Sequence, residues 1–137
     1  DWSSDVCSSD LSGMTAQSMR LNVVASNIAN VDSAVASNGD PYKARRVVFT
    51  PIPVRDGIPQ VNSVKVTAVV EDQSPPKMVY DPKHPLANQQ GYVTMPNINP
   101  VEEMADMIAA SRAYQTNVEL MNTTKTLLKS ALSIGQQ

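Results

Sequence analysis

The chain has 137 residues, of which 42% are hydrophobic and 4% aromatic, and its formal net charge is −2 at pH 7. This weak charge gives no electrostatic reason to expect nucleic acid or an anionic membrane as a partner, and the single cysteine, Cys7, excludes an intrachain disulfide framework and a cysteine-based zinc cluster. No apolar run approaches the roughly 20 residues that span a bilayer, and no signal peptide opens the chain.

The first ten residues, DWSSDVCSSD, differ in composition from the rest of the chain, because Ser and Asp dominate and an initiator Met is missing. We expect residues 1–10 to be a non-native or disordered start. No function is assigned to Trp2 or Cys7.

An N-terminal helix is predicted within residues 11–33, over Met14–Val31. Positions separated by steps of three and four form a mostly apolar stripe, which consists of Leu11, Met14, Ser18, Leu21, Ala25 and Ile28. The helix is expected to end near Asn30, where the chain continues with turn-forming residues. Asn27 and Asn30 invite specific hydrogen bonds from side chain to backbone, which favours a packing role; the alternative is a frayed helix end with Asn as the capping residue.

Residues 34–96 are predicted to form a β-hairpin and an extended, proline-rich segment. The runs 42–50 and 61–71 are rich in β-branched residues and are typical of strands, and Asp56-Gly57 is expected to turn the chain between them. One face of the second strand is expected to carry Val64, Val66, Ala68 and Val70. Four of the ten prolines lie in residues 75–85, which predicts an arm of fixed direction leading to the last helix.

A C-terminal helix is predicted within residues 97–137. Asn99 can cap it, Pro100 fits the first helical position, and Gly135 ends it. Steps of four and three define a seam with the spacing of a coiled coil, made of Met107, Ser111, Tyr114, Val118, Met121, Lys125, Leu128 and Leu132. Because Ser111 and Lys125 interrupt the seam and several Asn and Thr residues are weak helix formers, the helix is expected to need packing partners.

The two stripes share one spacing and lie at opposite ends of the chain. We therefore predict a mainly α fold with a small β part. Its N- and C-terminal helices are expected to pair as a coiled-coil hairpin or to add to a shared bundle, with the extended β-hairpin and loop segment between them in the sequence.

Candidate catalytic chemistry is sparse. The one histidine, His84, has no second histidine or nearby cysteine to make a metal or general-base site. Glu102, Glu103 and Asp106 are explained by the positive end of a helix dipole. The basic cluster at residues 43–46 is a weak footprint for single-stranded nucleic acid. A solvated strand face or a salt-bridge site between proteins is the favoured interpretation. We expect no enzyme activity, no metal and no cofactor.

Two motifs make the chain resemble the flagellar rod, hook and related axial proteins. The first is SGMTAQSMRLNVVASNIANVDS, in which ASNIANV at residues 25–31 is most specific, and the second is NINPVEEM at residues 97–104, followed by MI at 107–108 and RAYQTN at 112–117. Residues 80–85 and 91–93 are similar to the short members of this family that form the proximal rod. The resemblance covers almost all of residues 12–137.

The resemblance implies a structural subunit of the proximal rod of a bacterial flagellar basal body, in the periplasmic space. It also implies export by the flagellar type III apparatus without a cleaved signal peptide, and assembly with itself and other rod subunits through paired terminal helices that form an inner tube. The residues expected to serve packing and assembly are Met14, Leu21, Ala25, Asn27, Ile28, Asn30, Met107, Tyr114, Asn117, Val118, Met121, Leu128 and Leu132.

Two other classes of function remain open alternatives. A soluble helical-hairpin adaptor or export-chaperone-like protein would also carry two amphipathic helices. A small enzyme would need a cleft with convergent polar groups, for which the sequence offers no candidate. No small-molecule substrate, nucleic acid or direct membrane insertion is expected.

Overall fold

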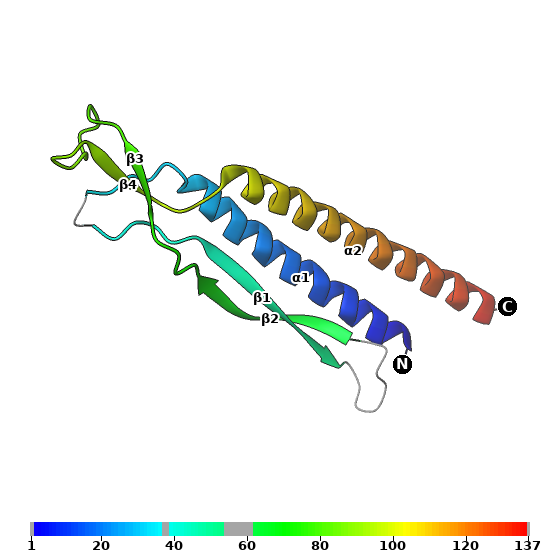
Figure 1. Cartoon of the computed structure of the whole chain (residues 1–137). Helices are drawn as coiled ribbons and strands as arrows, with labels where there is room; N and C mark the ends of the chain where they lie inside the picture. Colours follow the sequence, from blue (N-terminus) through cyan, green and yellow to red (C-terminus); the bar gives the residue numbers. More distant parts are fainter. Residues whose placement is uncertain (1, 37–38, 54–61, 137) are drawn as a thin grey trace.

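The computed structural model describes residues 2–36, 39–53 and 62–136, which form two long helices and two small antiparallel sheets (Figure 1). The elements are, in chain order, α1 (Trp2–Ala29), β1 (Arg45–Pro53), β2 (Asn62–Glu71), β3 (Lys77–Tyr80), β4 (Tyr92–Met95) and α2 (Pro100–Gly135). The predicted class, mainly α with a small β part between the terminal helices, is confirmed.

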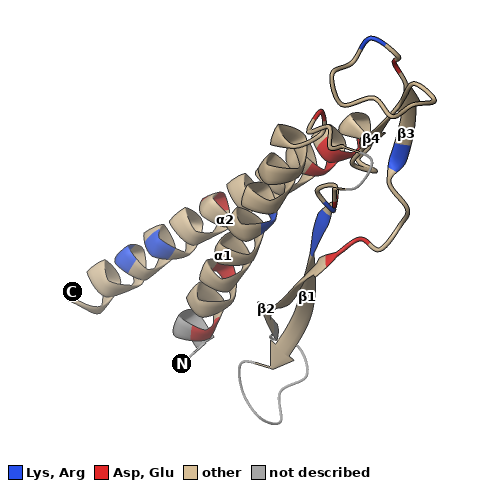
Figure 2. Cartoon of the chain, turned by 90° about the vertical axis from the view of Figure 1, so that its left-hand side faces the viewer, with Lys and Arg blue, Asp and Glu red and all other residues tan. Residues whose placement is uncertain are grey.

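The two helices lie side by side and antiparallel, with α1 between α2 and the β1–β2 hairpin (Figure 1). The last turns of α2 run past the first turn of α1 (Figures 1 and 2). Among the helices and strands of the described chain, only α1 packs along α2, and β1 reaches α2 through the ion pairs of Arg46 with Glu103 and Asp106. The helix pair therefore has one neighbour on the α1 side and none on the α2 side.

Helix α1 begins earlier than the sequence pattern predicted and ends at Ala29, close to the expected position. Residues 2–10, for which we expected a non-native or disordered start, continue the helix. Ser9 and Asp10 line the same shallow hollow as Thr116 of α2. Packing against α2 thus supports the first turns, as it does for most helices whose intrinsic propensity is low.

Helix α2 begins as its capping residues predicted. The Asn99 side chain accepts a hydrogen bond from the backbone N–H of Val101 at 3.1 Å, and Pro100 occupies the first position. Glu102 and Glu103 lie in the first turn, where the helix dipole favours negative charge. None of the helices in the described part of the chain combines the length and apolar character that a membrane span requires.

Strands β1 and β2 pair with a bulge. Val48 lies opposite Ala68, but Phe49 lies opposite Val66. Thr67 is therefore the extra residue of the bulge, with no residue of β1 opposite it in the register. A bulge resets the alternation of side chains along a strand. The expectation that Val64, Val66, Ala68 and Val70 share one face is therefore wrong, because the first two lie on one face and the last two on the other. The predicted turn at Asp56-Gly57 lies outside the described residues.

The proline-rich segment folds back on itself, where the sequence predicted an extended arm. Strand β3 pairs with β4, and Val35 forms a bridge to the other edge of β4 at Thr94. Gly91, just before β4, has a φ of 83°, which favours glycine. This second sheet lies at the end of the molecule where α1 ends and α2 begins (Figure 1).

The core of the described chain is small. Its buried apolar side chains are Ala16, Val24, Ala44, Val93, Pro96, Ile98 and Ala110. None of these is aromatic, and three are alanines, so the hydrophobic contribution to stability is limited.

Candidate functional site

The face of α2 that meets α1 is offset from the predicted seam. The regular series of buried and half-buried positions in α2 is Glu103, Met107, Ala110, Tyr114, Asn117, Met121 and Thr124. Predicted members Met107, Tyr114 and Met121 belong to this series, whereas Ser111 and Val118 are half-buried beside it. Lys125, Leu128 and Leu132 are exposed.

The predicted stripe of α1 is also displaced from the buried face. Met14, Leu21 and Ile28 are half-buried, but Leu11, Ser18 and Ala25 are exposed, and the deepest positions are Ala16, Val24 and Asn27. The displacement arises because α1 has neighbours on two sides, α2 and the hairpin. The centre of its buried arc falls between these neighbours rather than on the most apolar residues.

Gly13 of α1 lies directly against the Asn117 side chain of α2. A Cβ added there would lie 2.8 Å from Asn117 Nδ2, whereas a Cβ at Gly135 would meet nothing within 4 Å. Asn117, a predicted packing residue, therefore packs on the bare backbone of α1.

We predict that Gly13→Leu separates the helices and lowers stability by about 1–3 kcal/mol, despite the better helix propensity of leucine. The measurement is helix content by circular dichroism during a titration with trimethylamine N-oxide, which favours folded states. Gly135→Leu is the matched control and should leave the titration midpoint unchanged. Equal midpoints for Gly13→Leu and the wild-type chain would contradict the close contact.

Asn27 lies at the centre of a buried polar junction, which we define as Asn27, Tyr42, Arg45, Arg46 and Glu103. The Asn27 side chain is 0% exposed. Its Nδ2 donates to the Arg45 carbonyl at 2.8 Å and to Glu103 Oε2 at 3.0 Å. Its Oδ1 accepts from the Arg45 backbone N–H at 2.9 Å and from the Tyr42 hydroxyl at 3.1 Å. One amide group thus joins α1, the start of β1 and the first turn of α2, with all its hydrogen-bonding capacity used.

Ion pairs extend the polar junction to the surface. Arg46 lies 3.7 Å from Glu103 Oε1 and 3.6 Å from Asp106 Oδ2, and Arg20 lies 2.8 Å from Asp106 Oδ1. Glu103 is 1% exposed, so Asn27 and Arg46 together satisfy a buried carboxylate. Half-exposed arginines add little energy by themselves, and the contribution of Arg46 lies mainly in compensating the buried charge.

Asn30 has a different environment from Asn27. Its Nδ2 donates to the Ser26 carbonyl at 2.8 Å, and its Oδ1 accepts from the Ser33 hydroxyl at 3.2 Å. These bonds close the end of α1. The structure therefore places Asn27 in interior packing and Asn30 at the helix terminus.

Sequence reasoning missed two members of the polar junction. Glu103 was explained by the helix dipole, and Tyr42 was given no specific role, whereas Arg45 and Arg46 were assigned to a basic cluster. Periodicity gave no signal for Glu103, because the alternating steps of the predicted seam lead back from Met107 to Met104.

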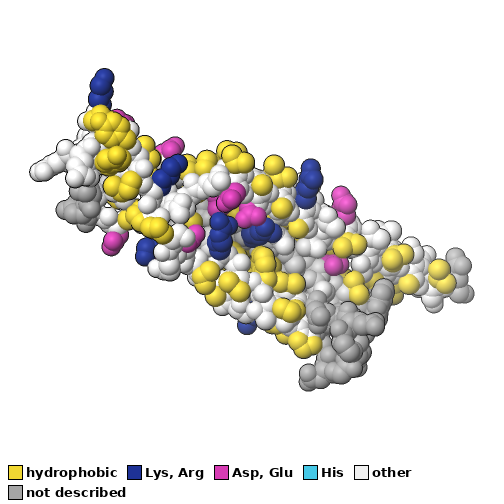
Figure 3. Space-filling view, viewed as in Figure 1, with side chains coloured by type: hydrophobic (Ala, Val, Ile, Leu, Met, Phe, Trp, Pro, Cys, Tyr) yellow, Lys and Arg dark blue, Asp and Glu magenta, His cyan; other side chains and the backbone are white. Residues whose placement is uncertain are grey.

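Large apolar side chains remain exposed on three parts of the helices (Figure 3). They are Val101, Met104 and Ile108 at the start of α2, Leu120, Leu127, Leu128, Leu132 and Ile134 toward its end, and Leu11 and Met19 on α1. We call the second group the α2 tail surface. Leu132 and Ile134 are 68% and 75% exposed, because the end of α2 extends beyond the first turn of α1. Exposed apolar groups of this kind mark surfaces for other macromolecules.

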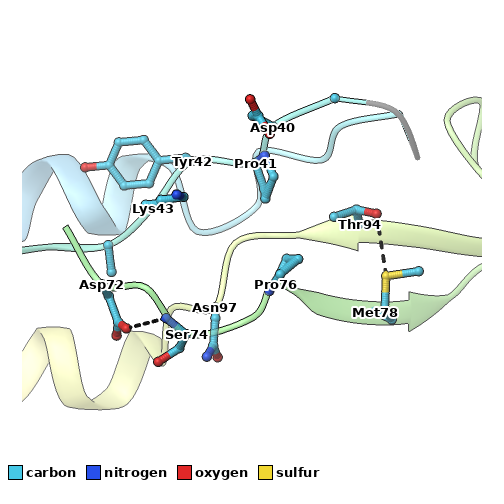
Figure 4. A pocket seen from close by; sticks show the side chains of 12 residues that line it. Asp40, Pro41, Tyr42, Lys43, Asp72, Ser74, Pro76, Met78, Thr94 and Asn97 are labelled. Atoms are coloured by element: carbon cyan, nitrogen blue, oxygen red, sulfur yellow. Dashed lines mark hydrogen bonds between the residues drawn. The ribbon is translucent and has the colours of Figure 1, made fainter.

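The hollow drawn in Figure 4 offers no catalytic arrangement. It has a volume of about 420 Å³ and lies among Tyr42, Lys43, Asp72, Asn97 and neighbouring residues. The hydroxyl and backbone N–H of Ser74 lower the pKa of Asp72, which explains that carboxylate as part of a turn. Since the pKa is lowered, this turn contact is present at neutral pH and is lost as the pH falls through the lowered value.

The predicted loop histidine has a structural partner. The backbone N–H of Leu86 donates to His84 Nδ1 at 3.1 Å. Within the described ranges, no group of three His, Cys, Asp or Glu side chains is arranged to hold a metal ion.

Comparison with known proteins identifies similar chains. Residues 9–38 match the family model described as flagella basal body rod protein, and residues 89–134 match the model described as flagellar basal body rod FlgEFG protein C-terminal. The flagellar basal-body rod protein FlgC of Escherichia coli O6:H1 is 49% identical over 125 residues, covering 91% of this chain and 92% of the relative. FlgC of Salmonella typhimurium is 47% identical over 127 residues, with the same coverage. FlgC of Borreliella burgdorferi is 42% identical over 141 residues, covering 90% and 91%.

Proposed function

Because the chain belongs to the FlgC family of flagellar basal-body rod proteins, we propose that α1 and α2 are the surfaces through which it is built into the rod. The chain is a structural subunit of the proximal rod of the flagellar basal body. Its role is structural, and the residues that carry this role are those that pack between helices and between subunits.

The uncovered apolar surface of α2 supports this proposal. In the described chain α1 is the one element packed along α2. Strand β1 meets α2 near its start through Arg46, and no further element packs on the α2 tail surface. A chain that functions alone would gain stability by covering these side chains. Their exposure is expected if neighbouring subunits complete the packing.

The energetics couple folding to assembly. Burying one leucine, isoleucine or methionine contributes about 1.5–3 kcal/mol, whereas ordering the backbone costs about 1–2 kcal/mol per residue. With a core of small side chains, the balance within one subunit is close. Contacts with several neighbours shift it toward the ordered helices, which then pair as a coiled coil. Contacts between unlike surfaces that do not close into a ring produce a helical filament.

The same proposal covers the route and the setting of the protein. The chain is exported from the cytoplasm by the flagellar type III apparatus, and it joins a rod in the periplasmic space together with other rod subunits. It has no enzymatic activity and needs no cofactor. Packing residues on α1 are Met14, Leu21, Ala25, Asn27, Ile28 and Asn30, and those on α2 are Met107, Tyr114, Asn117, Val118, Met121, Leu128 and Leu132.

We predict that the terminal helices are poorly ordered in the free chain at low concentration. Far-ultraviolet circular dichroism of the dilute monomer should show low helicity without a sharp thermal transition. Assembly with other rod proteins should raise the helical signal. High helicity with cooperative melting in dilute solution would contradict the coupling of folding to assembly.

The function itself is tested by assembly. Size-exclusion chromatography and negative-stain microscopy of the chain with the other rod proteins should reveal rod-like particles. A soluble adaptor would instead give a stable monomer or dimer that binds one client stoichiometrically. Such a result would replace the rod assignment for this chain.

A further inference from the structure

The base of the β1–β2 hairpin, defined here as residues 42–46, is held to α2 by polar contacts alone. Neither β1 nor β2 packs against α2 in the described chain. Two links nevertheless join them. In the first link, Glu103 accepts a hydrogen bond from the Asn27 amide, which is also hydrogen-bonded to the backbone of Arg45. In the second link, Arg46 forms an ion pair with Glu103 at 3.7 Å.

The link through Asn27 depends on the presence of α2. The last torsion of an asparagine side chain is soft, so the amide needs a partner on each side to keep one orientation. One Nδ2 hydrogen is directed to Arg45 and the other to Glu103. Asn27 is 0% exposed with α2 in place, and Glu103 of α2 lies against its amide. Without α2, water would compete for the bonds between Asn27 and Arg45, and these bonds would weaken.

The far part of the hairpin has an independent attachment. The backbone N–H of Val64 donates to the Ser12 hydroxyl of α1 at 3.1 Å. Val64 and Val66 line a groove with Leu11 and Ala16 of α1. These contacts join β2 to α1. Val64 also borders the shallow hollow between the helices that Thr116 and Asn117 line, but its backbone hydrogen bond is made to α1.

We propose that the polar junction makes docking of the hairpin base conditional on pairing of α2 with α1. Pairing fixes the Asn27 amide, and the fixed amide holds the backbone of Arg45 by two bonds. The far part of the hairpin stays on α1 in either state. Pairing of α2 with α1 therefore sets the orientation of the hairpin base relative to α1. It acts within one subunit and is independent of the rod assignment.

The test compares two amide protons of the full chain by hydrogen exchange in nuclear magnetic resonance. Arg45 N–H reports the hairpin base and Val64 N–H reports the far attachment. Trimethylamine N-oxide is added to the level at which circular dichroism shows the wild-type helices formed. Ala110→Leu inserts bulk at a 0% exposed position between the helices, and Ala109→Leu is the exposed matched control. Glu103→Ala removes the acceptor for Asn27, and Glu103→Gln keeps one.

We expect Arg45 to exchange about tenfold faster or more in Ala110→Leu and Glu103→Ala, and within about twofold of the wild type in Ala109→Leu and Glu103→Gln. Val64 should change less than about twofold in all four variants. Unchanged protection of Arg45 in Glu103→Ala would overturn the proposal. So would equal acceleration of Arg45 and Val64, because the hairpin would then be released as one unit. If Ala110→Leu unfolds the chain and both amides lose their protection from exchange, the comparison of Glu103→Ala with Glu103→Gln tests the proposal.

Discussion

A Leu128→Asp chain is expected to be made in normal amounts and to fail to enter the rod, so that cells that depend on it do not swim. Leu128 continues the series Met107, Tyr114, Met121 in steps of seven, toward the end of α2 whose last turns run past the first turn of α1. It is 38% exposed, so the free chain should tolerate the change within about 0.5 kcal/mol. Within an interface the new carboxylate would have to be buried without a partner, which costs several kcal/mol per subunit.

The measurement is swimming in soft agar by a host that lacks its own FlgC, together with immunoblots of purified basal bodies. Ser133→Asp is the matched control, because Ser133 is exposed further along α2 and points away from the α2 tail surface. We expect normal swimming for Ser133→Asp and none for Leu128→Asp. Normal swimming by both variants would show that the end of α2 is not an assembly surface.

Asn27→Leu should have the largest effect on the isolated chain. Leucine matches the shape of asparagine but removes the hydrogen bonds to the Glu103 carboxylate, the Arg45 backbone and the Tyr42 hydroxyl, and leaves Glu103 with Arg46 alone at 3.7 Å. Removing one partner of a buried charged group costs about 3–5 kcal/mol. That loss is comparable to the whole stability of a small domain.

Titration with trimethylamine N-oxide, monitored by circular dichroism, measures this loss. Asn27→Leu should need far more osmolyte to become helical, or should not fold at all. Asn22→Leu is the matched control, because Asn22 is exposed on the same helix. Adding Glu103→Met to Asn27→Leu should recover part of the stability, since it removes the uncompensated charge. An Asn27→Leu midpoint equal to that of Asn22→Leu would mean that the polar junction is energetically neutral.

Local chemistry explains why several expectations agree with the structure. Asn99 and Pro100 begin α2, and turn residues after Asn30 end α1 close to the predicted place. The runs rich in β-branched residues form the paired strands β1 and β2. Each of these features depends on residues within a few positions of one another, so the sequence pattern is sufficient to locate them.

Errors arose where distant segments compete for one surface. The bulge at Thr67 divides the valines of β2 between two faces, and alternation alone gives no sign of it. The stripe of α1 contains Leu11, which the hairpin and α2 both leave exposed. Periodicity marks which residues are apolar, but it cannot distinguish side chains covered within one chain from those that remain open.

By itself, the sequence determined the two helical ends, the β segment between them and, through the motifs around Asn27 and Asn99, the protein family. Tertiary structure alone decided which faces meet. The bond between Asn27 and Glu103 joins residues 76 positions apart, and the packing of Gly13 on Asn117 joins the two helices. Both depend on the relative rotation of α1 and α2. That rotation is set by the sum of contacts from α2 and the hairpin, and no local pattern encodes such a sum.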